Sequence, residues 1–102
     1  MSGKSLFQKV WDDHIVVPES DDTPAIPYID LHLTHEVTTP EAFNVLRSRG
    51  LSIRRPDLTV ATLDHSTPTV PIATLKDLDA VSEPAAAAQI RTMIENCRKN
   101  DI

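Results

Sequence analysis

Proline placement is the feature that most constrains how this chain can fold. Eight prolines are spread over the 102 residues, at positions 18, 24, 27, 40, 56, 68, 71 and 84. Because proline fixes φ, lacks an amide proton and disrupts the interiors of helices and sheets, only short segments remain between these positions. We therefore expect several short helices and strands around one modest core, and the length supports a single domain.

Composition excludes several classes of protein. Fifteen acidic side chains against ten basic ones give a formal net charge of −5, and no stripe of Lys and Arg is present to neutralise phosphates, so nucleic-acid binding is not expected. No apolar run approaches the roughly 20 residues of a membrane helix, and the N-terminus lacks the apolar stretch of a secretory signal. The lone Cys97 favours a reducing compartment, so we expect a cytoplasmic protein.

Hydrophobic periodicity predicts alternating helices and strands. The expected elements are helices at 5–13, 39–49 and 84–99, and strands at 14–17, 28–34 and 58–63. This order is typical of an α/β arrangement, and it leaves sheet edges open. In the last helix the apolar stripe consists of Ile90, Met93, Ile94 and Cys97, which predicts a packed thiol at Cys97.

The strand at 28–34 alternates in polarity. Ile29, Leu31 and Leu33 are predicted to face the core, while Asp30, His32 and Thr34 face away. By the same alternation His35 lies on the packed side at the end of the strand, where it either caps a buried polar network or faces a cleft. His32 and His35 fall on opposite faces, so no joint metal site is predicted.

Two further segments carry specific expectations. Thr38 and Glu41 form a possible capping box for the helix at 39–49, and Gly50 is the expected stop. The pair Arg54-Arg55 either holds a substrate carboxylate or lies in a solvated loop.

The dipeptide Asp64-His65 follows a predicted strand and opens a polar loop, the position where α/β folds place functional groups. Two interpretations stay open. The residues form a turn stabilised by Asp64 and Thr67, or they converge into a carboxylate–imidazole pair that donates protons near neutral pH.

Five blocks of this sequence, taken together, resemble the 3-isopropylmalate dehydratase large-subunit family, a branch of the aconitase family. They are Trp11–Val16, Tyr28–Thr38, Pro40–Phe43, Arg54–Thr59 and Ala61–Thr69, and they follow the family's order over nearly all of residues 5–70. The segment Gln89–Asn100 resembles the next family segment.

The resemblance implies that residues 1–102 are the N-terminal portion of an aconitase-type three-layer α/β/α iron–sulfur domain, incomplete on its own. It implies a hydro-lyase of leucine biosynthesis that isomerises 2-isopropylmalate and 3-isopropylmalate through 2-isopropylmaleate. The family enzyme carries a [4Fe-4S] cluster and pairs with a small subunit as a heterodimer. By this resemblance Asp64 and His65 are the catalytic pair that protonates the departing hydroxyl, and His35 contacts the substrate.

The sequence departs from the family in its cysteines. The family's cluster takes three cysteine ligands, and this chain has only Cys97, so the ligands are absent and the chain alone is expected to be inactive. Two alternatives stay open. The chain is a non-catalytic interaction module that binds the small subunit or a full-length large subunit, or it belongs to a related hydro-lyase such as homoaconitase.

Overall fold

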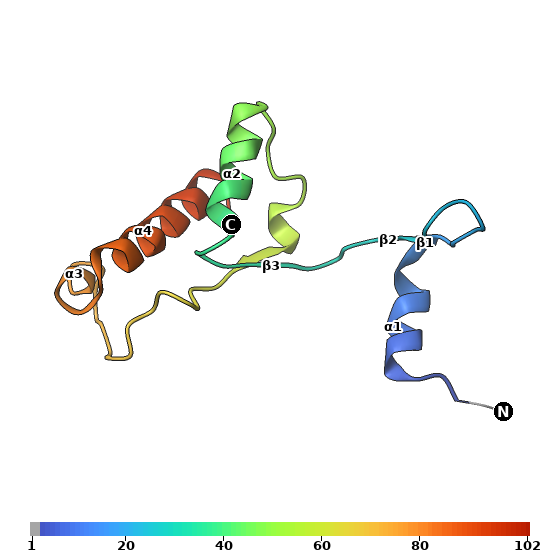
Figure 1. The fold of residues 1–102 in the computed structure, drawn as a ribbon, viewed down its shortest axis with the longest axis horizontal. Coiled ribbons are helices and arrows are strands. Elements are labelled where there is room, and N and C mark those ends of the chain that lie inside the picture. Colours follow the sequence, from blue (N-terminus) through green and yellow to red (C-terminus); the bar gives the residue numbers. More distant parts are fainter. Residues whose placement is uncertain (1–2) are drawn as a thin grey trace. The chain divides into compact units, whose positions relative to one another are not determined.

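The computed structural model describes residues 3–102, which divide into two compact units (Figure 1). Unit 1 extends to Asp30 and contains α1 (Leu6–His14), β1 (Ile15–Val17) and β2 (Ile26–Pro27). Unit 2 covers Leu31–Ile102 and contains β3 (His32–Thr34), α2 (Thr39–Ser48), the 3-10 helix η1 (Pro56–Leu58), β4 (Thr59–Ala61), α3 (Leu78–Val81) and α4 (Pro84–Lys99). The mixture of helices and short strands agrees with the predicted α/β class.

Unit 1 begins with a well-capped helix. The amide of Gln8 donates to the hydroxyl of Ser5, and the amide of Ser5 donates to the side chain of Gln8, which completes a capping box for α1. The prediction that His14 begins the first strand is wrong, because this residue ends α1 and its Nδ1 lies 2.6 Å from the carbonyl of Val10. The chain then pairs β1 with β2 in an antiparallel hairpin.

Unit 2 is built on two parallel strands. Leu33 of β3 is opposite Val60 of β4, and the amide of Thr62 extends the ladder by donating to the carbonyl of Thr34 at 3.0 Å. The predicted strand at 58–63 is shorter than expected, because Pro56 starts the turn of η1 immediately before it. Since parallel strands run in the same direction, β3 and β4 end at the same edge of the sheet.

The predicted strand at 28–34 is wrong in its extent, because only His32–Thr34 forms β3, and it is also wrong in which face is packed. Thr34 is only 5% exposed, whereas Leu33 is 66% exposed. The physical reason is that Thr34 and Phe43 of α2 line the same small pocket of about 320 Å³, so the side of β3 that carries Thr34 is the packed one. Leu33 and Val60 lie exposed on the other face of the strand pair.

The helices of unit 2 follow their predicted ranges closely. In α4, Ile90 and Met93 are buried as expected, Ile90 packs with Leu78 and Ala87, and Ile94 and Cys97 are partly exposed. The helix α3 was not predicted. Across residues 3–102, no helix combines the length and apolar character needed to cross a membrane.

The predicted capping box of α2 is wrong in its residues. Thr38 is the N-cap, but its side chain accepts no capping hydrogen bond. The neighbouring hydroxyl of Thr39 instead accepts a hydrogen bond from the amide of His35 at 3.2 Å. The start of α2 therefore fixes the residue that follows β3. At the other end, Gly50 adopts a φ of +64°, as the predicted helix stop requires.

Candidate functional site

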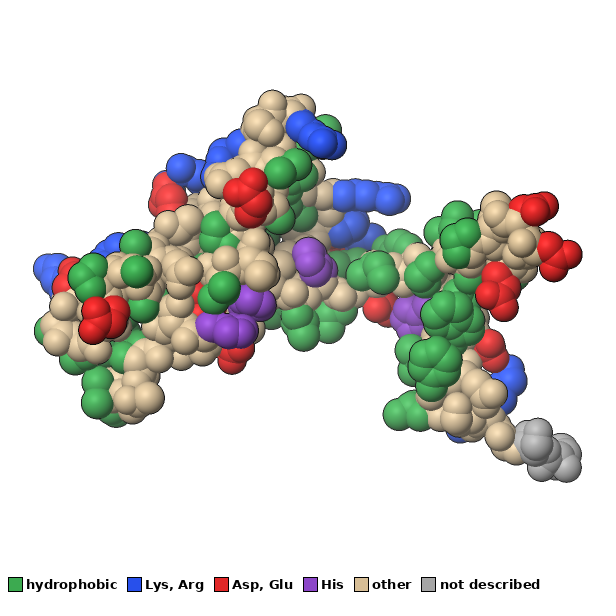
Figure 2. Space-filling model, in the orientation of Figure 1, with side chains coloured by type: hydrophobic (Ala, Val, Ile, Leu, Met, Phe, Trp, Pro, Cys, Tyr) green, Lys and Arg blue, Asp and Glu red, His purple; other side chains and the backbone are tan. Residues whose placement is uncertain are grey.

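The candidate site lies at the edge where β3 and β4 both end. His35 follows β3 directly, and Asp64 and His65 follow β4 after two intervening residues. The imidazole rings of His35 and His65 stack with their centroids 4.6 Å apart and their planes 28° from parallel. Figure 2 shows histidine side chains adjoining at the surface of the molecule. The structure thus brings together the three residues that the resemblance assigns to catalysis and substrate binding.

Asp64 and His65 satisfy both interpretations that the sequence left open. The hydroxyl of Thr67 donates to the carbonyl of Asp64 at 3.0 Å and closes a turn. Within that turn the carboxylate Oδ2 of Asp64 lies 3.1 Å from Nδ1 of His65. Both side chains are more than half exposed. A carboxylate at Nδ1 orients the imidazole ring, so Nε2 is the ring nitrogen that can serve another partner.

His35 is held in a defined tautomer by its own turn. Its Nδ1 accepts a hydrogen bond from the amide of Val37 at 3.3 Å. Because an accepting ring nitrogen carries no proton, the neutral ring bears its proton on Nε2. His35 is half-buried, so that it presents a single N–H donor from a fixed position.

Glu36 is the residue of this site that the sequence analysis missed. Its side chain is fully buried, its Oε2 accepts from the amide of Asp64 at 3.0 Å, and its Oε1 accepts from the amide of Ser66 at 2.5 Å. Burial works to raise the pKa of the Glu36 carboxyl, but amide donation from Ser66, Glu36 itself, Asp64 and His65 outweighs it and lowers the pKa.

The signal for Glu36 was present in the sequence but hidden by the reversed alternation. Glu36 is two residues beyond Thr34 and shares its parity, and Thr34 faces the packed side of β3. An acidic residue on that side, directly after a strand, is a candidate for a buried polar anchor. Correct assignment of the strand faces would have identified it.

The loop that carries Asp64 and His65 is also fastened to a helix. The hydroxyl of Ser66 donates to the side-chain oxygen of Gln89 on α4 at 2.6 Å. The loop is therefore held on one side by the carboxylate of Glu36 and on the other by α4.

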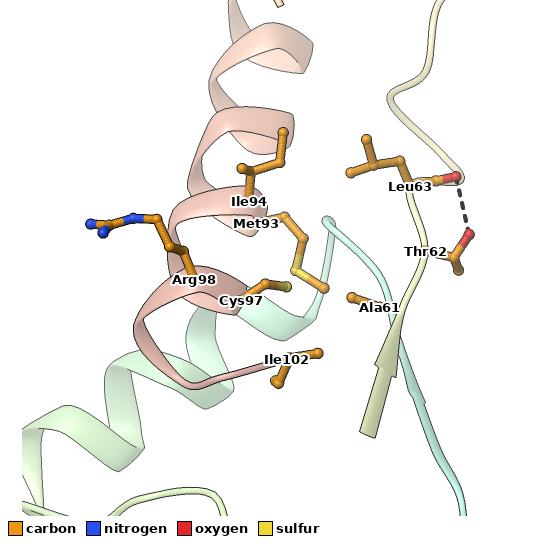
Figure 3. A pocket seen from close by; sticks show the side chains of 8 residues that line it. All are labelled: Ala61, Thr62, Leu63, Met93, Ile94, Cys97, Arg98 and Ile102. Carbon is orange, nitrogen blue, oxygen red and sulfur yellow. Dashed lines mark hydrogen bonds between the residues drawn. The ribbon is translucent and has the colours of Figure 1, made fainter. Parts of the chain in front are cut away.

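An apolar pocket of about 470 Å³ lies beside the end of β4 (Figure 3). It is lined by Ala61, Thr62, Leu63, Met93, Ile94, Cys97, Arg98 and Ile102. Burial raises the pKa of the Cys97 thiol, which disfavours the thiolate. His35, Asp64 and His65 do not line this pocket, so it is a separate feature of unit 2.

The residues of this chain do not fit a [4Fe-4S] cluster. Such a cluster is held by cysteine thiolates, and the sequence contains only Cys97, whose thiol is partly buried. Among residues 3–102, no group of three or more His, Cys, Asp or Glu side chains is arranged to hold a metal ion.

The remaining candidates have other partners. Arg55 makes two hydrogen bonds to the carboxylate of Asp57, from Nε at 2.8 Å and from Nη2 at 2.6 Å, and both side chains are exposed, which agrees with a solvated loop. His14 belongs to unit 1, where its Nε2 lies 2.8 Å from the carboxylate of Asp30. His32 lines the pocket beside α2.

Comparison with known proteins places this geometry in a family context. Residues 8–102 match the Aconitase family (aconitate hydratase). The chain is 55% identical over 94 residues to the 3-isopropylmalate dehydratase large subunit of Roseiflexus castenholzii and 53% identical over 94 residues to that of Anaeromyxobacter dehalogenans. Each alignment covers 92% of this chain but only 20% and 19% of those proteins, so the chain spans about a fifth of their length. No solved structure matches the chain.

Proposed function

We propose, because the chain belongs to the aconitase family, that it is the part of a 3-isopropylmalate dehydratase large subunit that carries an acid group of the active site. The identity of 53–55% to two large subunits over 92% of the chain supports the choice of reaction. The observation that carries the proposal is the stack of His35 on His65, with the carboxylate of Asp64 at Nδ1 of His65.

In this proposal His65 is the general acid of a dehydration. The protonated ring of His65, oriented by the contact of Asp64 with Nδ1, gives its Nε2 proton to the hydroxyl of 2-isopropylmalate as the carbon–oxygen bond breaks. A base outside this chain takes the proton from the neighbouring carbon, so the double bond of 2-isopropylmaleate forms and the hydroxyl departs as water. Addition of water with the opposite orientation then gives 3-isopropylmalate.

His35 has a binding role in the same proposal. With its Nδ1 occupied by the amide of Val37, the ring offers Nε2–H as a hydrogen-bond donor. A substrate carboxylate oxygen is the acceptor that fits this donor, so His35 orients the substrate against His65. No step is assigned to the family's cluster, because the donor set for it does not fit this chain.

The test is a chimera of the Roseiflexus castenholzii large subunit in which this chain replaces the aligned segment, assembled with the cognate small subunit. We expect the chimera to hydrate 2-isopropylmaleate and the His65→Gln variant to lose about 10²–10⁴-fold in kcat, the usual contribution of a general acid. The His35→Gln variant raises KM. His32→Gln is the control, because His32 lies beside α2 and not in the stack. A His65→Gln chimera with the kcat of its parent contradicts the proposal.

The isolated chain is expected to behave differently from the chimera. It has one thiol, so anaerobic treatment with iron and sulfide should leave it without a cluster and without hydro-lyase activity. Cluster absorption that remains on the purified chain contradicts this expectation.

A non-catalytic interaction module is the second candidate function. It is favoured by the exposed apolar face of the β3–β4 pair, where Leu33 and Val60 lie side by side in register. In this alternative the chain binds the small subunit or a full-length large subunit, and native mass spectrometry of the mixture should detect the complex.

A further inference from the structure

We infer that Glu36 is the positioning residue of this site: its buried carboxylate fixes the turn at 64–66 and thereby sets the place of Asp64 and His65 against His35. The inference rests on the proposed function for its catalytic meaning. The positioning itself is a property of the described chain and can be measured without catalysis.

The first argument is geometric. Glu36 follows His35 directly, so one short segment after β3 carries both the ring that stacks on His65 and the carboxylate that holds the turn of His65. Oε2 accepts from the amide of Asp64 at 3.0 Å and Oε1 from the amide of Ser66 at 2.5 Å, one on each side of His65. The backbone on both sides of His65 is thus fixed by hydrogen bonds to the same carboxylate.

The second argument comes from burial. Asp64 and His65 are more than half exposed, and an exposed loop of this kind ordinarily has several conformations. Glu36 is 0% exposed. Hydrogen bonds to an ionised acceptor that is shielded from water are stronger than hydrogen bonds between neutral groups. A buried carboxylate therefore restrains an exposed loop more than a solvated carboxylate does.

The third argument concerns the choice of acid over amide. Both oxygens of Glu36 face N–H donors. A glutamine has one accepting oxygen, and its NH₂ group would face one of the two amides donor to donor. An aspartate has the right charge, but it is one methylene shorter and cannot reach both amides from the same backbone position. Glutamate is therefore the side chain that this position requires.

The experiment is nuclear magnetic resonance on the whole 102-residue chain, comparing the wild type with Glu36→Gln, Glu36→Asp and Glu41→Gln. Glu41 is an exposed glutamate on the first turn of α2 and serves as the matched control. Three quantities are read: hydrogen exchange of the Asp64 and Ser66 amides, the nuclear Overhauser effect between the His35 and His65 rings, and the methyl shifts of Ile90 and Met93 in the core.

We expect Glu36→Gln to speed exchange at Asp64 and Ser66 by about tenfold or more and to abolish the ring-to-ring effect, while the core methyl shifts stay in place. Glu36→Asp should fall between Glu36→Gln and the wild type, and Glu41→Gln should match the wild type. A ring-to-ring effect that persists in Glu36→Gln overturns the inference. Loss of the ring contact together with the core shifts also overturns it, because Glu36 would then be a general structural residue.

The wild-type chain provides a measurement that does not depend on the folding of a variant. The amides of Asp64 and Ser66 should be protected from exchange although their loop is exposed, and unprotected amides overturn the inference. The chimera with Glu36→Gln separates this inference from the proposed function. If the rings part and the activity is unchanged, the positioning stands and the proposed function is wrong; if both are lost together, both are supported.

Discussion

Two carboxylates of this chain, those of Glu36 and Asp30, each accept hydrogen bonds from a segment that contains a histidine. One carboxylate is buried and the other is exposed. Glu36 in unit 2 is fully buried and accepts two backbone amides around His65. Asp30 in unit 1 has a side chain that is 60% exposed, and its carboxylate lies 2.8 Å from Nε2 of His14. The same chemical group is therefore a fixed internal acceptor in one unit and a solvated partner in the other. We therefore expect the buried carboxylate to order its segment more strongly than the exposed ion pair does.

The largest effect is expected from removing the buried anchor. Glu36→Ala removes the acceptor of the partly buried amides of Asp64 and Ser66, which should lower the free energy of unfolding by about 2–4 kcal/mol. Urea denaturation followed by circular dichroism measures the change. Asp30→Ala is the matched control and should produce a much smaller shift in midpoint. Equal shifts for the two variants would refute the comparison.

The contribution of Glu36 to stability should depend on pH. The pKa of Glu36 is lowered from its ordinary value of 4.5, so the ionised anchor stabilises the fold above that value, and the stabilisation is lost as the pH falls through the folded-state pKa. The stability difference between the wild type and Glu36→Gln should therefore shrink in acid. Urea midpoints of both proteins at several values between pH 7 and pH 3 measure it. A difference that stays constant over this range would show that the charge of Glu36 is not involved.

A smaller effect is expected on the other side of the loop. Ser66→Ala removes the hydroxyl that donates to Gln89 at 2.6 Å but keeps the amide that donates to Glu36. The cost should be about 1 kcal/mol, the usual value of one such hydrogen bond. The ring contact between His35 and His65 should survive in this variant. Loss of this ring contact would show that the hydrogen bond to α4, and not Glu36, positions the loop.

The smallest effect is expected at the exposed pair. The hydrogen bonds to Asp30 and to the carbonyl of Val10 raise the pKa of His14 above 6.5, and the bond to His14 lowers the pKa of Asp30 below 3.8. The pair therefore stabilises the fold between these two values and loses its effect as the pH rises through the folded-state pKa of His14. Asp30→Asn should move the titration of His14, followed by proton resonance, down toward its ordinary value. If the titration of His14 is unchanged in Asp30→Asn, the carboxylate of Asp30 does not stabilise the charged form of His14.

Much of the fold could be predicted from the sequence, because its signals were local. Pro40 lies in the first turn of α2 and Gly50 follows its end, and the periodic apolar residues of α4 predicted a helix that the structure confirms over Pro84–Lys99. The faces of β3 could not be predicted in this way. Alternation states which residues share a face, but it does not state which face packs on α2, and here the side with Thr34 is the packed one.

Sequence reasoning likewise identified some residues of the candidate site and missed another. His35, Asp64 and His65 were identified because each follows a predicted strand, and their contact required the parallel pairing of β3 with β4, which is a long-range property. Glu36 was missed because the packed face of β3 was assigned to Leu33 and not to Thr34, and because its role depends on the backbone amides of residues 64 and 66. Sequence reasoning therefore found the residues of the proposed site and not the residue that we infer to position them.

The central claim is that the ends of β3 and β4 form one site, and the most direct measurement is the nuclear Overhauser effect between the rings of His35 and His65 in the wild-type chain. The account predicts a strong effect, since the ring centroids are 4.6 Å apart. His32 provides an internal reference, because it lies beside α2 and is not part of this stack. If the rings of His35 and His65 show no contact in the folded chain, the site is not assembled and the proposed function loses its basis.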